Sequence, residues 1–98
     1  MPEVVVIEFE APDAIEIYRS VNRELGLDLE TGAGDWPAPL SNHIAAASDN
    51  KLIVVEIWDS RADQARFMER LGAAFQAANV PPPTSVEWFA LAGAMHRG

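Results

Sequence analysis

A histidine and a glutamate on two neighbouring predicted strands are the residues best suited to acid–base chemistry. Asp49-Asn50, typical of a tight turn, lies between the stretches that carry His43 and Glu56. A hairpin with a four-residue turn there places His43 directly opposite Glu56. A carboxylate beside an imidazole fixes its tautomer, and such a pair in an apolar cavity can act as a general base. The alternative is a polar pair that satisfies itself within a dimer interface.

Aromatic and acidic side chains accompany this pair. The same register places Trp58 opposite Ser41, on the side of the hairpin that holds His43, and strand parity puts Glu8 on that side too. Together with Tyr18 and Trp36, these side chains are candidates for binding a ligand. Packing in the core or at an interface is the alternative for each aromatic residue.

The sequence predicts no metal and no cofactor. Cysteine is absent, which excludes thiolate ligands and disulfides. The acids Asp28, Glu30 and Asp35 lack the spacing of a calcium loop and are interpreted as a solvated loop. His43 has the chemistry of a haem ligand, but nothing else in the sequence supports a haem site. His96 lies in the stretch 92–98, which we expect to be a frayed tail.

Length and charge exclude several classes of function. The chain has 98 residues and a formal net charge of −8. We expect one domain over residues 1–98, and repulsion from nucleic acid and from anionic membrane surfaces. Apolar stretches are all shorter than the roughly 20 residues needed to cross a bilayer. Because the N-terminal stretch also lacks the pattern of a signal peptide, we expect a cytoplasmic protein.

Hydrophobic patterning predicts four strands and two helices. Strands are expected over 4–9, 40–47, 52–58 and 84–91, and helices over 13–25 and 60–78. Asp13 and Ser60 are the expected N-caps. The apolar stripe expected on the second helix consists of Ala65, Met68, Leu71, Phe75 and Ala78. The irregular stretch 27–38, which carries Trp36, is the candidate lid.

This order of elements predicts an α+β, ferredoxin-like βαββαβ plait, in which two helices cover one face of a four-stranded antiparallel sheet. The helix-free face is assigned Val4, Val6, Leu52, Val54 and Trp58, which are too apolar for a face left in water. We therefore expect a homodimer formed through that face. For the last strand two facings stay open: the core side holds Val86, Trp88 and Ala90, or it holds Glu87, Phe89 and Leu91.

The chain also resembles a known family over nearly its whole length. The resemblance is carried by the helix with Tyr18, by Trp36-Pro37, and by the stretches 40–45 and 54–60. It is to the dimeric α/β barrel proteins, and among them to small proteins similar to antibiotic-biosynthesis monooxygenases. Members include cofactor-free oxygenases acting on polycyclic aromatic substrates, haem-degrading enzymes, lactone isomerases and proteins with no known activity. In the haem-degrading group a helix carries the histidine, whereas His43 lies on a predicted strand.

Two functions follow as hypotheses, and whether the protein is an enzyme stays open between them. In the first, a small aromatic molecule binds in a cavity between helix-free sheet faces, and the chemistry is cofactor-free oxygenation or proton abstraction. His43 is then the base, Glu56 orients it, and Trp58 and Trp36 pack against the ligand. In the second, the protein is a non-catalytic dimeric binding or structural module, and side chains of the partner fill that space.

Overall fold

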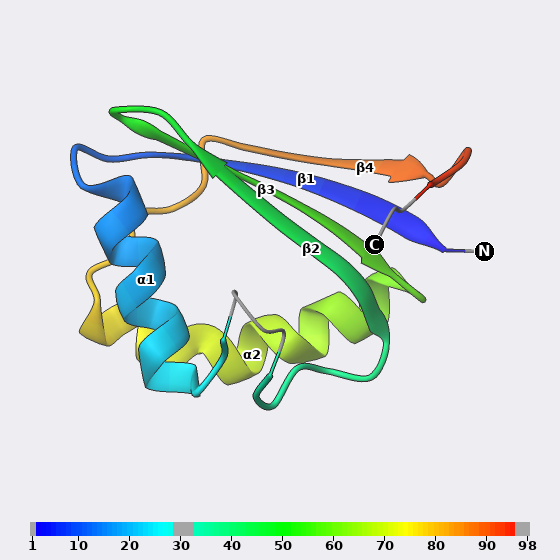
Figure 1. Cartoon of the computed structure of the whole chain (residues 1–98), viewed down its shortest axis with the longest axis horizontal. Coiled ribbons are helices and arrows are strands. Elements are labelled where there is room, and N and C mark those ends of the chain that lie inside the picture. Colours follow the sequence, from blue (N-terminus) through cyan, green and yellow to red (C-terminus); the bar gives the residue numbers. More distant parts are fainter. Residues whose placement is uncertain (1, 29–32, 96–98) are drawn as a thin grey trace.

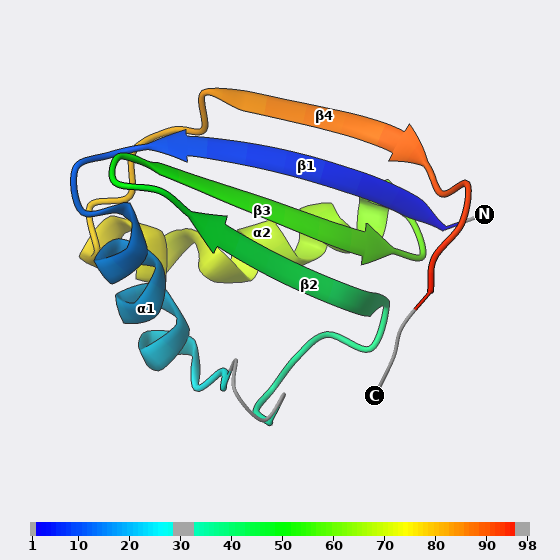
Figure 2. The same cartoon turned by 45° about the horizontal axis from the view of Figure 1, so that its top comes forward.

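One antiparallel sheet and two helices make up the computed structural model, which describes residues 2–28 and 33–95. The strands lie in the order β2-β3-β1-β4, so that β1 and β3 are central (Figure 2). Both helices lie on one side of the sheet (Figure 1), and the predicted α+β ferredoxin-like plait is confirmed. In chain order the elements are β1 (Glu3–Glu10), α1 (Ala14–Leu25), β2 (Leu40–Ala47), β3 (Lys51–Trp58), α2 (Arg61–Ala77) and β4 (Ser85–Ala90).

The two helices begin and end differently. The hydroxyl oxygen of Ser60 accepts a hydrogen bond from the Asp63 backbone N–H at 3.2 Å, so Ser60 caps α2 as predicted. Asp13 precedes α1, but its side chain makes no capping hydrogen bond, and the prediction of a side-chain cap there is wrong. At its other end α1 stops at Gly26, whose φ of 71° is the left-handed conformation that glycine adopts without strain.

The β2–β3 hairpin has the predicted register along most of its length. Ala46 lies opposite Ile53, and His43 lies opposite Glu56. The register shifts between Leu40 and Asn42, so that Trp58 pairs with Leu40 and the expected Ser41–Trp58 pair is absent. This irregularity leaves Ser41 exposed, with its hydroxyl donating to the Ile57 carbonyl at 3.2 Å.

The predicted facing of β3 is wrong. Val54 and Trp58 are 6 % and 0 % exposed and pack in the core beneath the helices. On β1, Val5 pairs with Glu56 and is itself fully buried, so Glu56 also faces the helices. The alternate side chains of β3, Ile53, Val55 and Ile57, therefore lie on the helix-free face. Val4 and Val6 do lie on that face, as predicted, because they pair with Ile57 and Val55.

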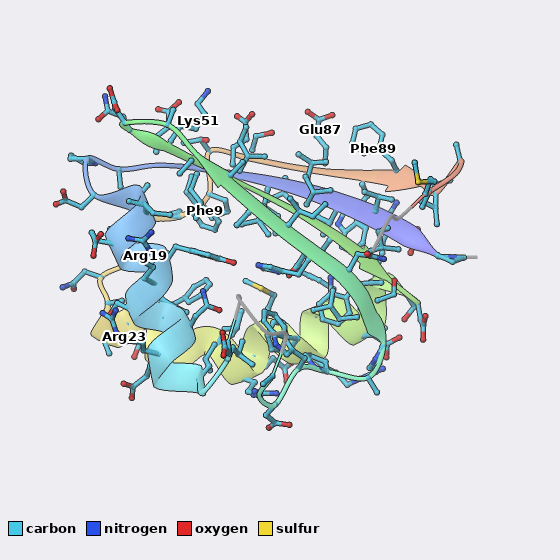
Figure 3. The ribbon with its side chains drawn as sticks, in the orientation of Figure 1. Phe9, Arg19, Arg23, Lys51, Glu87 and Phe89 are labelled. Carbon is cyan, nitrogen blue, oxygen red and sulfur yellow. The ribbon has the colours of Figure 1, made fainter. Side chains whose placement is uncertain are left out.

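The remaining strand and helix complete this core. On β4, Trp88 pairs with Val5 and packs against the core, whereas Glu87 and Phe89 point away from the helices (Figure 3). This facing resolves the two alternatives left open for the last strand. On α2 the buried residues are Phe67, Leu71 and Ala74. The expected stripe contained Leu71 but neither of the other two.

The helix-free face keeps exposed apolar side chains. Ile44 on β2 is 58 % exposed, and Phe89 on β4 is 48 % exposed. Between them lie the partly buried valines and isoleucines of β1 and β3. Neither described helix is long and apolar enough to span a membrane.

Candidate functional site

The histidine–glutamate pair forms inside the protomer. His43 Nδ1 lies 2.7 Å from Glu56 Oε2, and the two side chains are only 13 % and 6 % exposed. Strand pairing brings them together, because β2 and β3 place them directly opposite each other on the face covered by the helices. The site therefore lies between the sheet and the helices, and the predicted position between helix-free sheet faces is wrong.

Trp58 donates a hydrogen bond to the second oxygen of the Glu56 carboxylate. Its indole Nε1–H donates to Glu56 Oε1 at 3.0 Å, and its ring packs against Phe67 with centroids 5.6 Å apart. Glu56 thus accepts hydrogen bonds at both oxygens, which suits an ionised carboxylate that can only accept. In the neutral imidazole, His43 then carries its ring hydrogen on Nδ1, and its Nε2 lone pair is left as the acceptor.

Tyr18 on α1 occupies that acceptor. Its hydroxyl lies 2.5 Å from His43 Nε2, and the two rings are within 5° of parallel. Since Nε2 has a lone pair in this tautomer, Tyr18 is the donor. The result is one directional network: Tyr18 donates to His43, His43 donates to Glu56, and Trp58 donates to Glu56 from the other side.

Tyr18 stays protonated at neutral pH. Burial raises its pKa from 10.0 to about 12, a contribution from the Asn22 side chain opposes this shift, and the negative charge of Glu56 adds to it. A phenol that keeps its proton at neutral pH cannot act as a phenolate base, and its O–H remains available as a hydrogen-bond donor. Within this network, His43 Nε2 is therefore the atom able to take up a proton.

An apolar cavity of about 90 Å³ adjoins the network. It lies between the sheet and the two helices, where Phe9 points inward from β1 (Figure 3). Tyr18, His43 and Glu56 are among the few polar side chains in its wall. The apolar lining comes from every layer of the fold and includes Ile7, Phe9, Ile17, Val21, Leu52, Val54, Phe67, Met68 and Leu71.

Trp36 covers one side of this cavity. Its ring centroid lies 5.1 Å from that of His43, and its indole N–H donates to the Ala33 carbonyl at 3.2 Å. Arg70 on α2 donates to the Asp35 carbonyl at 2.9 Å, which ties the segment before Trp36 to the helix layer. The structure thus brings Trp36 to the site, whereas the suggested role of its segment as a lid stays a prediction.

Two of the predicted ligand-binding residues lie elsewhere. Glu8 pairs with Ile53 and belongs to the helix-free face, so the sheet separates it from His43. Trp58 is fully buried beside Phe67 and is not part of the cavity wall. Both positions follow from the facing of β3, because parity across the β1–β3 ladder assigns Glu8 and Glu56 to opposite faces.

Sequence reasoning missed the buried Asn22. Its amide donates to the Tyr18 carbonyl at 2.8 Å, and its side chain also lines the cavity. The available signal was its position one helical turn after Tyr18. The described residues include no group of three or more histidines and carboxylates that could hold a metal. Glu30 and His96 lie outside the described residues.

Comparisons with known proteins show the same architecture. No family model and no curated protein matches the sequence. A candidate antibiotic biosynthesis monooxygenase from Chloroflexus aurantiacus superposes with a TM-score of 0.66 at 12 % identity, with 100 % of both chains covered. A Nitrosomonas europaea protein of unknown function gives 0.67 at 15 %, with 99 % of this chain and 95 % of its own covered.

A third solved structure extends this likeness. The protein Rv0793 of Mycobacterium tuberculosis gives a TM-score of 0.65 at 17 % identity, with 98 % of this chain and 100 % of its own covered. At such identities the likeness is one of fold and not of chemistry. The chain therefore has the ferredoxin-like fold that these solved structures share, among them the candidate antibiotic biosynthesis monooxygenase.

Proposed function

We propose that this protein is a cofactor-free enzyme that removes a proton from a small, electron-rich aromatic molecule. The observation that carries the proposal is the Tyr18–His43–Glu56 network, which ends in an otherwise apolar cavity. An apolar pocket with a few convergent polar groups is the usual form of a small-molecule site. Buried ionisable networks of this kind are also where acid–base catalysis is found.

His43 is the base in this proposal. A substrate O–H or activated C–H displaces the Tyr18 hydroxyl from Nε2 and gives its proton to that nitrogen. Glu56 then lies 2.7 Å from Nδ1 of the resulting imidazolium and stabilises its charge. Tyr18, which is uncharged at neutral pH, donates its hydrogen bond to the developing oxyanion of the substrate. Trp36 packs against the aromatic ring.

Deprotonation prepares the substrate for oxygenation by dioxygen. An activated CH2 group of an aromatic ring system then becomes a carbonyl: one oxygen atom of O2 enters the C=O bond, and the other leaves as water with the two hydrogens. Carbon is oxidised by four electrons, and the same four electrons reduce O2. The apolar wall of the cavity supports this step because it keeps water from the carbanion.

A homodimer is part of the proposal, because the helix-free face carries Ile44 and Phe89 in exposed positions. A second copy would cover both. The site lies on the other side of the sheet, so dimerisation does not close it. A non-catalytic module whose cavity is filled by its partner is the weaker alternative, because the cavity beside His43 is lined by the protomer's own sheet and helices, away from the helix-free face.

The test is oxygen consumption with a panel of anthrones, naphthols and hydroquinones. We expect turnover of at least one class, with kcat lowered about 100-fold or more by His43→Ala, as is usual when a general base is removed. Glu56→Gln should lower kcat as well. Glu69→Gln, on the exposed surface of α2, is the matched control and should leave the rate unchanged.

The same panel identifies the outcome that would overturn the proposal. If His43→Ala keeps the wild-type rate on every substrate that is turned over, His43 is not the base. Circular dichroism of each variant shows that a lost rate reflects the site and not the fold. Native mass spectrometry of the fresh protein reports both a bound ligand and the dimer.

A further inference from the structure

A second recess adjoins the cavity on the outer side of the Tyr18–His43 pair. It has a volume of about 580 Å³ and lies between α1 and the edge strand β2. We call it the outer groove, and the described residues of its wall are Ile15, Tyr18, Arg19, Asn22, Arg23, Leu27, Asp28, His43 and Ala45. Tyr18, Asn22, Leu27 and His43 line both recesses, so these residues form the boundary between them.

The two volumes limit how a ligand can reach His43. Sites for small molecules usually have volumes of about 300–1,000 Å³. The inner cavity, at about 90 Å³, is well below this range, whereas the outer groove is within it. A ligand that contacts His43 therefore places a small apolar part inside and most of its bulk in the groove.

Two arginines give the outer groove its charge. Arg19 and Arg23 stand one turn apart on α1, and both side chains project from that helix in Figure 3. Like charges at this spacing repel each other and destabilise a helix slightly. Arg23 lies in the last turn, where a positive charge interacts favourably with the helix dipole. Arg19 lies too far from the end of the helix for the dipole to explain a positive charge there.

Arg19 and Arg23 also have little compensating charge among the described residues. Among the described arginines, Arg61, Arg66 and Arg70 have ion pairs with Glu3, Asp63 and Asp35. Arg19 has only an exposed contact with Glu16 at 3.2 Å, a kind of pair that contributes little. Arg23 has no ion-pair partner in the described part of the chain. Counted over the described residues of its wall, which include Arg19, Arg23 and Asp28, the outer groove has a net positive charge, whereas the whole protein carries −8.

We propose that the outer groove binds an anionic group of the ligand, a carboxylate or an anion of similar shape, through Arg19 and Arg23. The ligand is then amphiphilic: its apolar end enters the inner cavity beside His43, and its acidic end stays in the groove. This inference rests on the proposed function, because it assigns the substrate class of the same site. It restricts the aromatic substrates to those that carry an acidic group.

The test compares phenylbutyrate with its neutral amide, two probes of nearly equal shape. Isothermal titration measures their affinity for the full chain and for Arg23→Gln, Arg19→Gln and the double variant. We expect the acid to bind more tightly than the amide to the wild type. The double variant should weaken the acid about three- to tenfold and leave the amide unchanged, as for partly exposed charge-assisted hydrogen bonds. Arg66→Gln, on α2, is the matched control and should change neither affinity.

Salt and NMR complete the experiment. Added salt should weaken the binding of the acid and not that of the amide. If acid and amide bind equally and both shift the His43 ring signals, the anion site is wrong while the proposed cavity stands. If neither probe binds or shifts those signals, the cavity proposal fails, and the groove assignment fails with it.

Discussion

His43 and Glu56 face each other across the β2–β3 ladder, with Nδ1 and Oε2 2.7 Å apart. This contact sets the direction of every hydrogen bond around the histidine. An ionised carboxylate accepts only, so a neutral His43 donates from Nδ1 and accepts at Nε2. Tyr18 must then donate, and the direction of the network follows from the charge of one buried side chain.

Glu56→Gln should reverse that direction. The amide oxygen can still accept from Trp58, which turns the amide NH2 toward His43 Nδ1. Nδ1 must then accept, so the ring hydrogen moves to Nε2 and Tyr18 becomes the acceptor. We expect nitrogen-15 NMR to show the Nδ1–H tautomer of His43 in the wild type and the Nε2–H tautomer in Glu56→Gln.

The chain makes this measurement simple, because it has only two histidines, His43 and His96. His96→Gln identifies the signals of the other ring and should leave the tautomer of His43 unchanged. The same tautomer in Glu56→Gln as in the wild type would show that the carboxylate does not set the direction of the network.

Tyr18 should titrate far above a free tyrosine. Burial raises its pKa to about 12, and it is the only tyrosine in the chain. The phenolate absorbance of the folded protein therefore reports this one residue. We expect a midpoint near pH 12 in the folded state and near pH 10 in urea. Equal midpoints in both states would contradict the burial of this hydroxyl against His43.

The same shift makes stability depend on alkaline pH. A raised pKa means that the folded state holds the phenolic proton more tightly than the unfolded state. The stabilisation is fully present below pH 10 and is lost as pH rises toward 12. Relative to Tyr18→Phe, the wild type should lose about 1–2 kcal/mol of unfolding free energy over this window, allowing for solvent screening of a partly buried phenol. Chemical denaturation at several pH values measures the difference.

The sequence was sufficient to predict the contact between His43 and Glu56. Turn residues at Asp49-Asn50 and apolar stretches of equal length on either side allow few registers, and a slip by one residue would turn every side chain over. The bulge at Ser41 lies at the far end of the hairpin. At that end the turn has least control over the pairing. The register was therefore predicted wrongly at Ser41 and correctly at His43.

The facing of β3 could not be predicted in the same way. Both alternate sets of its side chains are largely apolar, so the hydrophobic pattern alone does not distinguish the two facings. The core in fact receives the set that contains Glu56 and Trp58. A buried carboxylate is tolerated there because Trp58 and His43 supply its two hydrogen bonds. These hydrogen bonds depend on three-dimensional contacts, which the pattern of apolar residues in the sequence does not show.

The bond between Tyr18 and His43 also lay beyond the sequence. It joins residues on α1 and β2 that no turn or ladder connects, so it depends on how α1 packs on the sheet. The periodicity of apolar residues along a helix does not indicate which strand its apolar face will meet. The order of the elements predicted the architecture, and the contact itself required the packed structure.

The two helix N-termini should respond differently to loss of their polar residues. Ser60→Ala removes both the acceptor for the Asp63 N–H and the hydroxyl that donates to Asp63 Oδ2 at 2.8 Å. It should lower the unfolding free energy by about 1 kcal/mol. Because the Ser60 hydrogen bond is the main cause of the lowered pKa of Asp63, that pKa should rise toward its usual range.

Asp13→Ala, at the start of α1, is the matched control for Ser60→Ala. Its side chain makes no capping hydrogen bond, so its loss should change the unfolding free energy by well under 1 kcal/mol. Urea denaturation of the two variants measures the difference. An equal loss of stability in both would mean that the Ser60 hydroxyl contributes nothing beyond its position before a helix.

A charge on the helix-free face should separate the proposed dimer. Ile44 is 58 % exposed in the protomer and belongs to the face that a second copy would cover. Ile44→Glu would bury a carboxylate without a partner, which is unfavourable by several kcal/mol. We therefore expect analytical ultracentrifugation to show a dimer for the wild type and a monomer for Ile44→Glu at the same concentration.

Ile15→Glu tests whether any charge at an exposed isoleucine has this effect. Ile15 is 37 % exposed but lies on α1, away from the sheet face, so the variant should remain dimeric. Because His43 lies on the opposite side of β2 from Ile44, the monomer should also keep the Nδ1–H tautomer of His43. A monomeric wild type would remove the dimer from the proposal and leave the site intact. A monomer that loses the tautomer would instead show that the dimer supports the site through the sheet.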